Sequence, residues 1–450
     1  MTMEVLPKIF EAVQFIKLKT RRTGILAPSM PRTIKVFEHE QLKIHANARG
    51  EKLEEHELSK LYEFNDQHGS QYFIGIRDGV KFTSYVGVIQ IGGLTLEILP
   101  KADRYVYNKE DHKIATTRWR NVLLQMLAIT QRIPVESVSE ASLEKRHHSI
   151  IDLYFQFFLN EVQKLLHRGL AKKYRSASGN LPVLKGRLDF NRNIQQNLIH
   201  RERFYTDHHV YDQDHLLNQI LLRALVILDR ITTSPFIKDK LARTLLDFPE
   251  VKQIHIQKHH FDCIIENRKT IPYREALKIA RMIILNYSPD IKGGGENMLA
   301  LLFDMNKLWE EYIYRSLLRV KPGDVTINFQ NSKTFWQSES LRKTIRPDLV
   351  IRRGSEIFVI DTKWKIINSL NPDDDDLKQI FTYNLYWRSY HSILLYPSTS
   401  CEFPSHYGKY HEGFDSEHGC SLAFVEVLNE TGALNKNCGE FILELASRIA

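Results

Sequence analysis

Two short apolar stretches decide how the C-terminal part of this 450-residue chain folds: Arg-Pro-Asp-Leu-Val-Ile at residues 346–351 and Val-Ile-Asp-Thr-Lys at residues 359–363. Both contain the β-branched and aliphatic residues that are typical of strands. Between them, Arg-Arg-Gly-Ser at residues 352–355 predicts a tight hairpin. A hairpin at this place lays Asp348 near Asp361, thirteen positions later.

The charged residues of this hairpin predict a metal site. Because alternate residues of a strand share a face, Asp361 and Lys363 are expected on one side and Thr362 on the other. Isolated buried charges are costly, so two carboxylates and an ammonium at one point are poor core material. They suit Mg²⁺, or Mn²⁺ in its place, because a hard cation takes oxygen ligands and keeps several waters. We predict that Asp348, Asp361 and the backbone carbonyl of Thr362 hold the ion. The alternative is an exposed hairpin whose charges lie in water.

The sequence Pro347-Asp348, followed by Asp361-Thr362-Lys363, resembles the signature of the PD-(D/E)xK nucleases. An acidic residue two positions before a lysine is common by chance, and the specificity comes from the two strands with a helix before and after them. The resemblance implies metal-dependent hydrolysis of a phosphodiester. In that reaction the cation polarises the scissile phosphate and lowers the pKa of a bound water. Lys363 would neutralise the developing charge or position that water.

The helices on either side of the hairpin supply further candidates. An amphipathic helix is predicted over residues 298–319, and the resemblance implies one more acid from it. Glu310 is the choice and Glu311 the alternative, against the interpretation that both are exposed helical glutamates. In the following helix, Gln379 and Tyr383 are four residues apart and share a face, where they could contact the metal-bound water or a phosphate. Simple packing is the alternative for Tyr383.

Composition and charge bound the class of protein. With 43% hydrophobic and 26% charged residues, the chain is expected to be globular, with two or three domains. The net charge of +8 and the pI of about 9.0 suit a nucleic-acid partner. Four scattered cysteines and the lack of an 18-residue apolar run predict a cytoplasmic protein without a membrane span. No GxxxxGK[ST] motif occurs, so GTP is expected to act only through a partner.

The sequence predicts an α+β multidomain chain with four parts. These are a flexible arm (1–30), a β-rich partner-docking domain (31–115), a helical middle region (116–292), and a C-terminal mixed α/β domain of the PD-(D/E)xK restriction-endonuclease-like type (293–450). The β-rich part contains Gly-Gly at 92–93 between two apolar runs, which predicts a hairpin.

Three other segments carry chemistry-bearing residues. Residues 192–215 are dense in basic residues and histidines, which suits a phosphate-tracking face or, equally, a solvated helix face. The four aspartates of 373–376 are expected to begin a helix, because acidic residues suit a helix N-terminus, and a second metal site is the alternative. The segment 401–420 could bind zinc, but it lacks C-x₂-C and H-x₃-H pairs, so a loop is favoured. Its candidate ligands are Cys401, His406, His411, His418 and Cys420.

Taken over residues 34–424, the chain resembles the McrC family, the nuclease subunits of McrBC-type modification-dependent restriction systems. The distinctive pieces are the nuclease signature and Leu-Glu-Ile-Leu-Pro-Lys at 96–101. Weaker pieces follow in the expected order: Val-Gly-Val-Ile at 86–89, Leu-His-Arg-Gly-Leu at 166–170 with Tyr174, Leu-Lys-Gly-Arg at 184–187, Asp214 with Asn218, and Leu-Trp-Glu-Glu-Tyr at 308–312. The family often has Phe where Trp309 stands.

The family resemblance implies a partner and a division of labour. Members work with a separate McrB-like AAA+ GTPase, which recognises methylated DNA and translocates it. The N-terminal region docks into that motor and stimulates its GTPase, while the C-terminal domain cuts double-stranded DNA and is a candidate for dimerisation. Two other functions stay open: a regulatory adaptor with little cleavage of its own, and a stand-alone nuclease. The recognised base modification and the cut position do not follow from the sequence.

Overall fold

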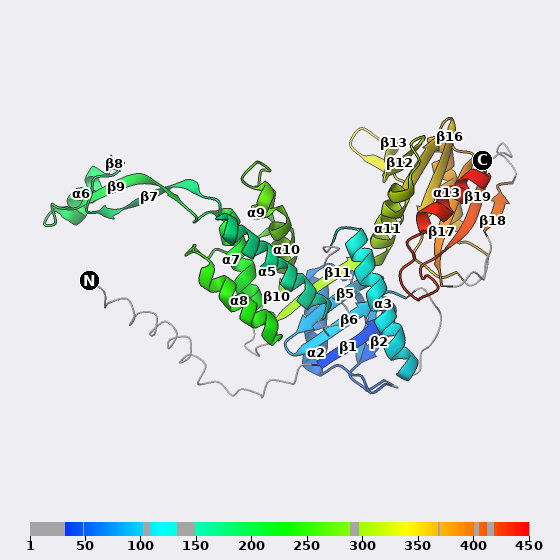
Figure 1. Ribbon diagram of the computed structural model, residues 1–450, viewed down its shortest axis with the longest axis horizontal. Helices are drawn as coiled ribbons and strands as arrows, with labels where there is room; N and C mark the ends of the chain where they lie inside the picture. Colours follow the sequence, from blue (N-terminus) through cyan, green and yellow to red (C-terminus); the bar gives the residue numbers. More distant parts are fainter. Residues whose placement is uncertain are drawn as a thin grey trace.

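The computed structural model describes residues 32–47, 49–101, 109–132, 149–288, 297–367, 370–399, 405–411 and 418–449. The predicted flexible arm (1–30) lies outside these ranges. The protein is α+β and multidomain. A five-stranded sheet lies near the centre, with a helical unit and a long β-ribbon on one side and a six-stranded sheet on the other (Figure 1). Among the described residues, no helix is long and apolar enough to cross a membrane.

The central sheet has the strand order β1-β6-β5-β11-β10. Its strands are β1 (Arg32–Phe37), β5 (Tyr85–Ile91), β6 (Leu94–Leu99), β10 (Tyr287–Ser288) and β11 (Met298–Asp304). β1 runs parallel to β6, and β5 and β6 form the antiparallel hairpin predicted at Gly92-Gly93. Gly87 allows β11 to approach β5, because a Cβ there would lie 2.1 Å from the carbonyl oxygen of Leu301.

A small second layer covers one part of this sheet. It consists of β2 (Gln41–Lys43), β3 (Phe73–Ile76), β4 (Gly79–Phe82) and α2 (Glu55–Gln67), with the strand order β2-β4-β3. Leu42, Leu61 and Phe73 are buried in one core with Ile89 and Leu96 of the central sheet.

The prediction of one helix over residues 298–319 is wrong. Its first seven residues form β11, and α11 (Met305–Val320) begins only after them. Met-Leu-Ala-Leu-Leu-Phe-Asp is an almost continuous apolar run, which periodicity alone cannot assign to strand or helix. Residues 298–304 form a strand because they pair with β5. Asp304 then caps α11 by accepting a hydrogen bond from the Asn306 N–H.

The middle region contains the predicted helices. They are α3 (Lys109–Ile129), α5 (Ile150–Arg168), α7 (Leu216–Ile231), α8 (Pro235–Asp247), the short α9 (Lys258–Asp262), α10 (Arg274–Leu285), and the 3₁₀ turn η2 (Ile271–Tyr273). Gly169, the C-cap of α5, has a φ of +81°. Their apolar faces join the main core, which continues into α11 and the C-terminal sheet.

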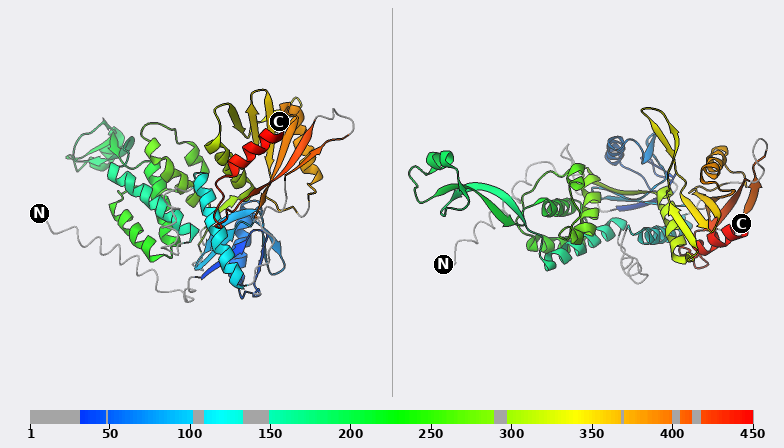
Figure 2. Two further views of the ribbon diagram at one scale, coloured as in Figure 1. Left: turned by 45° about the vertical axis from the view of Figure 1, so that its right-hand side comes forward. Right: turned by 90° about the horizontal axis from the view of Figure 1, so that it is seen from above.

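A ribbon of strands projects from this helical unit, and we call residues 173–212 the β-arm (Figures 1 and 2). β7 (Lys173–Leu181) pairs antiparallel with β9 (Phe204–Asp212), and the tip carries β8 (Arg187–Leu188) and α6 (Phe190–Asn197). The basic stretch 192–215 is therefore mostly ribbon, and the idea of one solvated helix face there is wrong. Cross-strand pairing with residues 173–181 overrides the local helical pattern.

Buried hydrogen bonds anchor the root of the β-arm. The Asn218 side chain, fully buried, donates to the carbonyl oxygens of Gln213 (2.7 Å) and Ala171 (3.3 Å). It accepts from the Tyr273 hydroxyl at 3.0 Å, and that hydroxyl accepts from the Ala171 N–H at 2.8 Å. Both ends of the ribbon are thus tied to α7 and η2, which gives the arm a defined direction.

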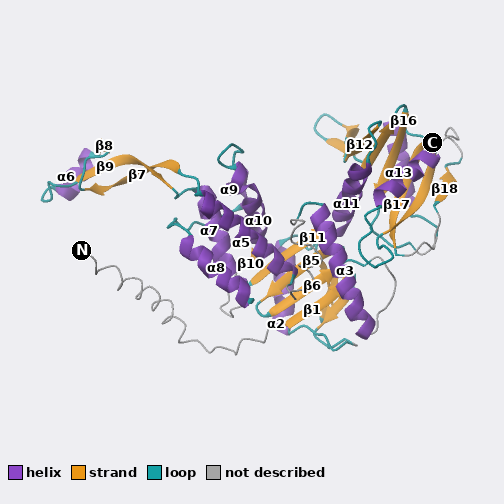
Figure 3. Cartoon of the chain, in the orientation of Figure 1, coloured by secondary structure: helices purple, strands orange, loops and turns teal. Residues whose placement is uncertain are grey.

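The C-terminal sheet has the order β12-β15-β16-β17-β19-β18. It lies at the C-terminal end of the molecule, where its strands are drawn in orange (Figure 3). Its elements are β12 (Val325–Phe329), β15 (Leu349–Arg353), β16 (Glu356–Thr362), β17 (His391–Ser398), β18 (His406–Lys409), β19 (Gly419–Glu426), α12 (Asp374–Trp387) and α13 (Cys438–Ile449). β13 (Lys333–Gln337) and β14 (Arg342–Ile345) form a separate hairpin.

Helices cover both faces of this sheet, which explains why its central strands are apolar throughout. Val350 and Val359 share a core with Ile380 of α12. Leu349 and Ile360, which point the other way, share a core with Ile442 of α13. The hairpin that carries the charged residues is therefore held rigidly from above and below.

Candidate active site

The hairpin of β15 and β16 brings the two predicted aspartates together. Leu349 pairs with Ile360, so the next residues outward, Asp348 and Asp361, lie opposite one another at the open end of the hairpin. Gly354 sits in the connecting turn with a φ of +60°, a conformation that glycine adopts without strain. The predicted proximity of the two carboxylates follows directly from this register.

Asp348 is held by Thr362. Its Oδ2 accepts hydrogen bonds from the Thr362 N–H at 2.7 Å and from the Thr362 hydroxyl at 2.9 Å. The hydroxyl contact departs from the expectation that Thr362 faces away, because Asp348 lies just before β15, where strict strand alternation no longer applies. Burial raises the pKa of Asp348 to about 8, and the negative charges of Asp361 and Glu310 add to this effect.

Asp361 is almost completely buried, with 3% of its surface exposed. Lys363 Nζ lies 2.7 Å from its Oδ2, which confirms that these two residues share one side. Beyond this lysine, Oδ2 has no hydrogen-bond donor among the described residues. Burial raises the pKa of Asp361, and the charge of Lys363 opposes the rise.

Lys363 is positioned by three partners. Its ammonium donates to Gln379 Oε1 at 2.9 Å and forms ion pairs with Asp361 and with Asp376, whose Oδ1 lies at 3.2 Å. Burial favours the neutral amine, but the two carboxylates outweigh this effect and raise the pKa of Lys363. The side chain therefore stays charged at neutral pH and acts as a cation rather than as a base.

Asp376 is a site residue that sequence reasoning missed. It lies in the first turn of α12, where Asp373 is the N-cap, as the acidic run predicted. Asp376 also contacts Lys365 Nζ at 2.5 Å, so it bridges two lysines. Burial raises the pKa of Asp376, yet its contacts with Lys365 and Lys363 outweigh burial and lower it. The signal in the sequence was the acidic run itself, which a helix start explained only in part.

α11 contributes one of its two glutamates to this cluster. Gln330 donates to Glu310 Oε2 at 3.1 Å. Burial raises the pKa of Glu310, and the charge of Asp361 raises it further. Glu311 is directed elsewhere, because its carboxylate pairs with Arg132 at 3.0 Å. The structure thus brings Glu310 to the aspartates and leaves Glu311 outside.

Gln379 and Tyr383 of α12 link the pocket to an open cavity. Gln379 Nε2 donates to the Tyr383 hydroxyl at 2.7 Å, and that hydroxyl donates to the carbonyl oxygen of Arg346 at 3.2 Å. Both side chains line a cavity of about 720 Å³, together with Gln330 and Arg346. A ligand in this cavity would therefore lie beside Lys363.

The donor set fits a hard divalent cation. Two buried carboxylates with raised pKa values repel each other, and a cation between them would remove that repulsion. Asp361 Oδ2, buried with no donor beyond Lys363 among the described residues, is the kind of oxygen that a cation binds. In the described part of the chain, no group of three or more His, Cys, Asp and Glu side chains is arranged to hold a metal. The predicted set has two carboxylates and a backbone carbonyl.

The segment with the zinc candidates is partly strand. His406 lies in β18, which pairs with β19, and Cys420 is buried within β19. His418 contacts the carbonyl oxygen of Ser389 at 3.1 Å. Cys401 lies outside the described residues. The expectation of a simple loop over 401–420 is wrong where β18 extends the sheet.

Comparison with known proteins gives three findings. The family model described as "McrBC 5-methylcytosine restriction system component" matches residues 80–397. The type IV methyl-directed restriction enzyme EcoKMcrBC of Escherichia coli strain K12 is 22% identical over 275 residues, which cover 58% of this chain and 74% of that protein. A chain of the Thermococcus gammatolerans half-complex of McrB AAA+ hexamers with bound McrC shares the fold. Its TM-score is 0.66 at 20% identity, over 92% of this chain and all of that one.

The family match spans well over half of the sequence and includes the Asp348–Lys363 hairpin, β5, β6 and the β-arm. The predicted resemblance is therefore confirmed: this chain belongs to the McrBC 5-methylcytosine restriction system component family, as an McrC-type subunit.

Proposed function

We propose that this chain is the Mg²⁺-dependent DNA endonuclease subunit of an McrBC-like complex, and that its C-terminal domain is of the PD-(D/E)xK type. One observation carries the proposal. Asp348 and Asp361, both buried and mutually repelling, meet at the end of a rigid hairpin beside a lysine that stays charged. A stable fold does not need this arrangement, whereas a metal-dependent nuclease does.

Asp348, Asp361 and the carbonyl of Thr362 would hold the ion, with Mn²⁺ as an alternative to Mg²⁺. When bound, the cation supplies polarisation of the phosphate and a water of lowered pKa. Lys363 contributes a fixed positive charge where the phosphorane charge develops, since Asp376 and Gln379 hold its ammonium in place. Glu310 lies close enough to bias the charge of the pocket and is the third acid of the proposed site.

The surface next to the pocket suits a DNA backbone. The β13–β14 hairpin exposes Phe335 and Trp336, each about half accessible, and carries Arg342 and Lys343 on its second strand. Aromatic and basic side chains together are typical of nucleic-acid contacts. The cavity lined by Arg346 and Gln379 opens beside this hairpin. We infer that duplex DNA binds along this surface, and the family resemblance implies that this DNA is methylated.

The motor is proposed to be a separate McrB-like AAA+ GTPase. The structural relative with the same fold is described as McrC bound to AAA+ hexamers, and this chain has no phosphate-loop motif of its own. We propose that residues 31–115 form the domain that docks on this motor. GTP would then enter the reaction only through the partner, and dimerisation through the nuclease domain stays a prediction.

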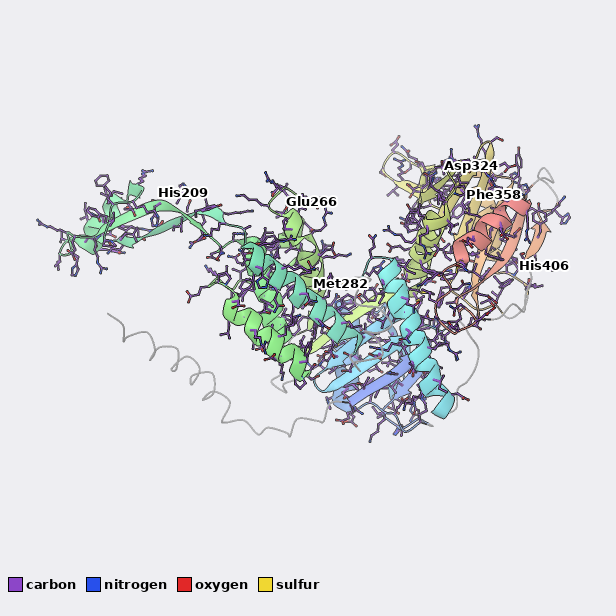
Figure 4. All side chains as sticks on the ribbon, viewed as in Figure 1. His209, Glu266, Met282, Asp324, Phe358 and His406 are labelled. Carbon is purple, nitrogen blue, oxygen red and sulfur yellow. The ribbon has the colours of Figure 1, made fainter. Side chains whose placement is uncertain are left out.

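A second candidate function, that of a motor regulator, is favoured by the β-arm. Its tip exposes large apolar side chains that no other described part of the chain covers: Val183, Leu184, Phe190, Ile194, Leu198 and Ile199. Contiguous exposed apolar residues of this kind mark contact surfaces. Regulation and cleavage are compatible, because the β-arm and the nuclease pocket lie at opposite ends of the molecule. Figure 4 shows this with His209 on the arm and Phe358 in the C-terminal sheet.

The decisive experiment measures cleavage of methylated plasmid DNA by the chain with its AAA+ partner, GTP and Mg²⁺. We expect cleavage that EDTA abolishes and Mn²⁺ restores. Cleavage without partner or GTP at the same rate would favour the stand-alone nuclease. Motor stimulation without any cleavage would favour the adaptor.

A further inference from the structure

A buried hydrogen bond joins the N-terminal domain to the residue that follows Lys363. The Trp364 indole N–H donates to Glu38 Oε1 at 2.7 Å. The same oxygen accepts from the Lys101 N–H at 2.7 Å. Glu38 directly follows β1, and both side chains are buried, with 5% and 7% of their surfaces exposed. The contact therefore connects the central sheet to the end of β16 without solvent between them.

Stability alone does not explain a carboxylate at this position. Glu38 Oε2 has no hydrogen-bond partner among the described residues, and the imidazole of His39, whose pKa burial lowers, lies 4.0 Å away. Burial raises the pKa of Glu38 to about 7, although the bonds from Trp364 and Lys101 oppose the rise. A half-satisfied buried acid is a poor stabiliser compared with an apolar pair of the same size. Its direct effect is to fix the orientation of one indole.

Trp364 in turn contacts the second element of the site. Its ring packs against Trp309 of α11, with 5.2 Å between ring centroids. Trp309 is fully buried and immediately precedes Glu310. One indole thus lies between the two backbone segments that present the proposed catalytic groups, Lys363 on one side and Glu310 on the other.

We propose that Glu38 is a positioning residue of the nuclease site, acting through Trp364. The hydrogen bond fixes the orientation of the Trp364 indole. The packing of this ring in turn fixes the relative position of Lys363 and Glu310 around the metal pocket. The inference rests on the proposed function and deepens it. It makes alignment of the pocket depend on the N-terminal domain, the part proposed to dock on the motor. A partner that shifts β1 or the turn after it would then change the rate of cleavage without touching the site.

The experiment compares Glu38→Ala, Glu38→Gln and Trp364→Phe in the full chain, with two readouts. The first is Mn²⁺ affinity of the purified chain by calorimetry. The second is DNA cleavage and GTPase stimulation in the complex with the AAA+ partner. Because partners of metal-site residues typically contribute 10–100-fold, we expect Glu38→Ala and Trp364→Phe to lower the cleavage rate roughly tenfold or more and to weaken Mn²⁺ binding. GTPase stimulation should stay within about twofold, since no motor contact is removed.

Two variants separate positioning from general damage. Glu38→Gln keeps an oxygen that accepts both N–H groups, so it should restore cleavage and Mn²⁺ affinity to near wild-type levels. Glu57→Ala is the matched control, because Glu57 is also buried in the N-terminal domain but pairs with Arg32 and not with the nuclease domain. It should lower the melting temperature while leaving Mn²⁺ affinity unchanged.

Four results would overturn the inference. One is a Glu38→Ala protein with the Mn²⁺ affinity and cleavage rate of Glu57→Ala. Another is a parallel loss of GTPase stimulation, which would make Glu38 part of the docking surface. A third is a wild-type chain that neither binds Mn²⁺ nor cleaves, which would remove the proposed function and this inference with it. The fourth is a Trp364→Phe variant with the cleavage rate and Mn²⁺ affinity of an active wild-type chain, which would remove this inference and leave the proposed function standing.

Discussion

The β-arm and the β15–β16 hairpin are both antiparallel ribbons with charged residues, yet they place those charges in opposite environments. In the arm, Arg175 pairs with Asp212 at 2.8 Å, but both side chains remain accessible to water. In the hairpin, Asp361 and Lys363 pair at 2.7 Å, with 4% and 21% of their side chains exposed. Water screens the first pair and leaves it of small energetic value, whereas burial is the largest influence on the pKa values of both partners in the second pair.

The difference shows what makes a ribbon a reaction centre. Helices cover the hairpin on both faces, so its charges cannot move apart or be hydrated freely. Beyond its anchored root, the β-arm is not covered by other described elements. Its side chains are therefore available to a partner but are not preorganised for chemistry. Four predictions would break or sharpen this contrast.

The largest expected effect is the loss of catalysis on removing the metal pocket. Asp348→Ala, Asp361→Ala or Lys363→Ala should lower DNA cleavage by roughly a thousandfold or more, because a bound metal and its neighbouring charge supply several kcal/mol to the transition state. The fold should persist, as circular dichroism would check, and GTPase stimulation by Asp361→Ala should equal that of the wild type. Wild-type cleavage by any of the three purified variants would contradict the site.

The second effect concerns the contact surface of the β-arm. Phe190→Ser combined with Ile194→Ser and Leu198→Ser should weaken stimulation of the motor roughly tenfold, since apolar anchors dominate contact energies. The unfolding free energy should change by no more than about 0.5 kcal/mol per substitution, because these side chains are already in water. Lys185→Ser and Arg201→Ser, at exposed positions near the same tip, form the matched control. Full stimulation by the triple variant would remove the arm as a motor contact.

A third effect should come from Asp376, which positions Lys363. Asp376→Asn keeps the shape but removes one counter-charge, so the Lys363 ammonium loses a partner at 3.2 Å. We expect roughly a tenfold lower cleavage rate with little change in Mg²⁺ requirement. Asp375→Asn, one residue earlier and exposed, should leave the rate unchanged. Equal rates for both variants would show that Asp376 does not position Lys363 for cleavage.

The smallest effect is on pH-dependent stability without metal. The pKa of Asp348 is raised from 3.8 to about 8 on folding, so the folded chain binds a proton that the unfolded chain has lost between these values. Stability should therefore fall as the pH rises from about 4 to about 8. Melting temperatures in EDTA should show this slope, Asp348→Asn should reduce it, and Mn²⁺ should oppose it most near pH 8. A melting temperature that rises over this range would contradict the pKa shift.

The hairpin, its flanking helix α12 and most of the candidate site could be predicted because their signals are local. The turn at residues 352–355 sets the register, and the register alone places Asp348 opposite Asp361. The misassigned element was β11, whose apolar run suits both strand and helix. Its pairing partner, β5, lies about two hundred residues earlier in the chain, and no local sequence pattern indicates a pairing over that separation.

Side-chain contacts between different helices and strands could not be predicted from the sequence either. Nothing in the sequence near Asp376 indicates that it turns toward Lys363, and nothing near Glu38 indicates a bond to an indole in another domain. The sequence analysis preferred Glu310 to Glu311, but only the structure shows that Glu310 faces the aspartates while Glu311 pairs with Arg132.

The sequence by itself determined the chemistry of this protein: which acids and which amine stand at the ends of two strands, and how a four-residue turn brings them together. Only the tertiary structure decided their protonation, their partners and their isolation from water. Those properties depend on burial between helices and sheets that come from distant parts of the chain, and burial is a property of packing rather than of local order.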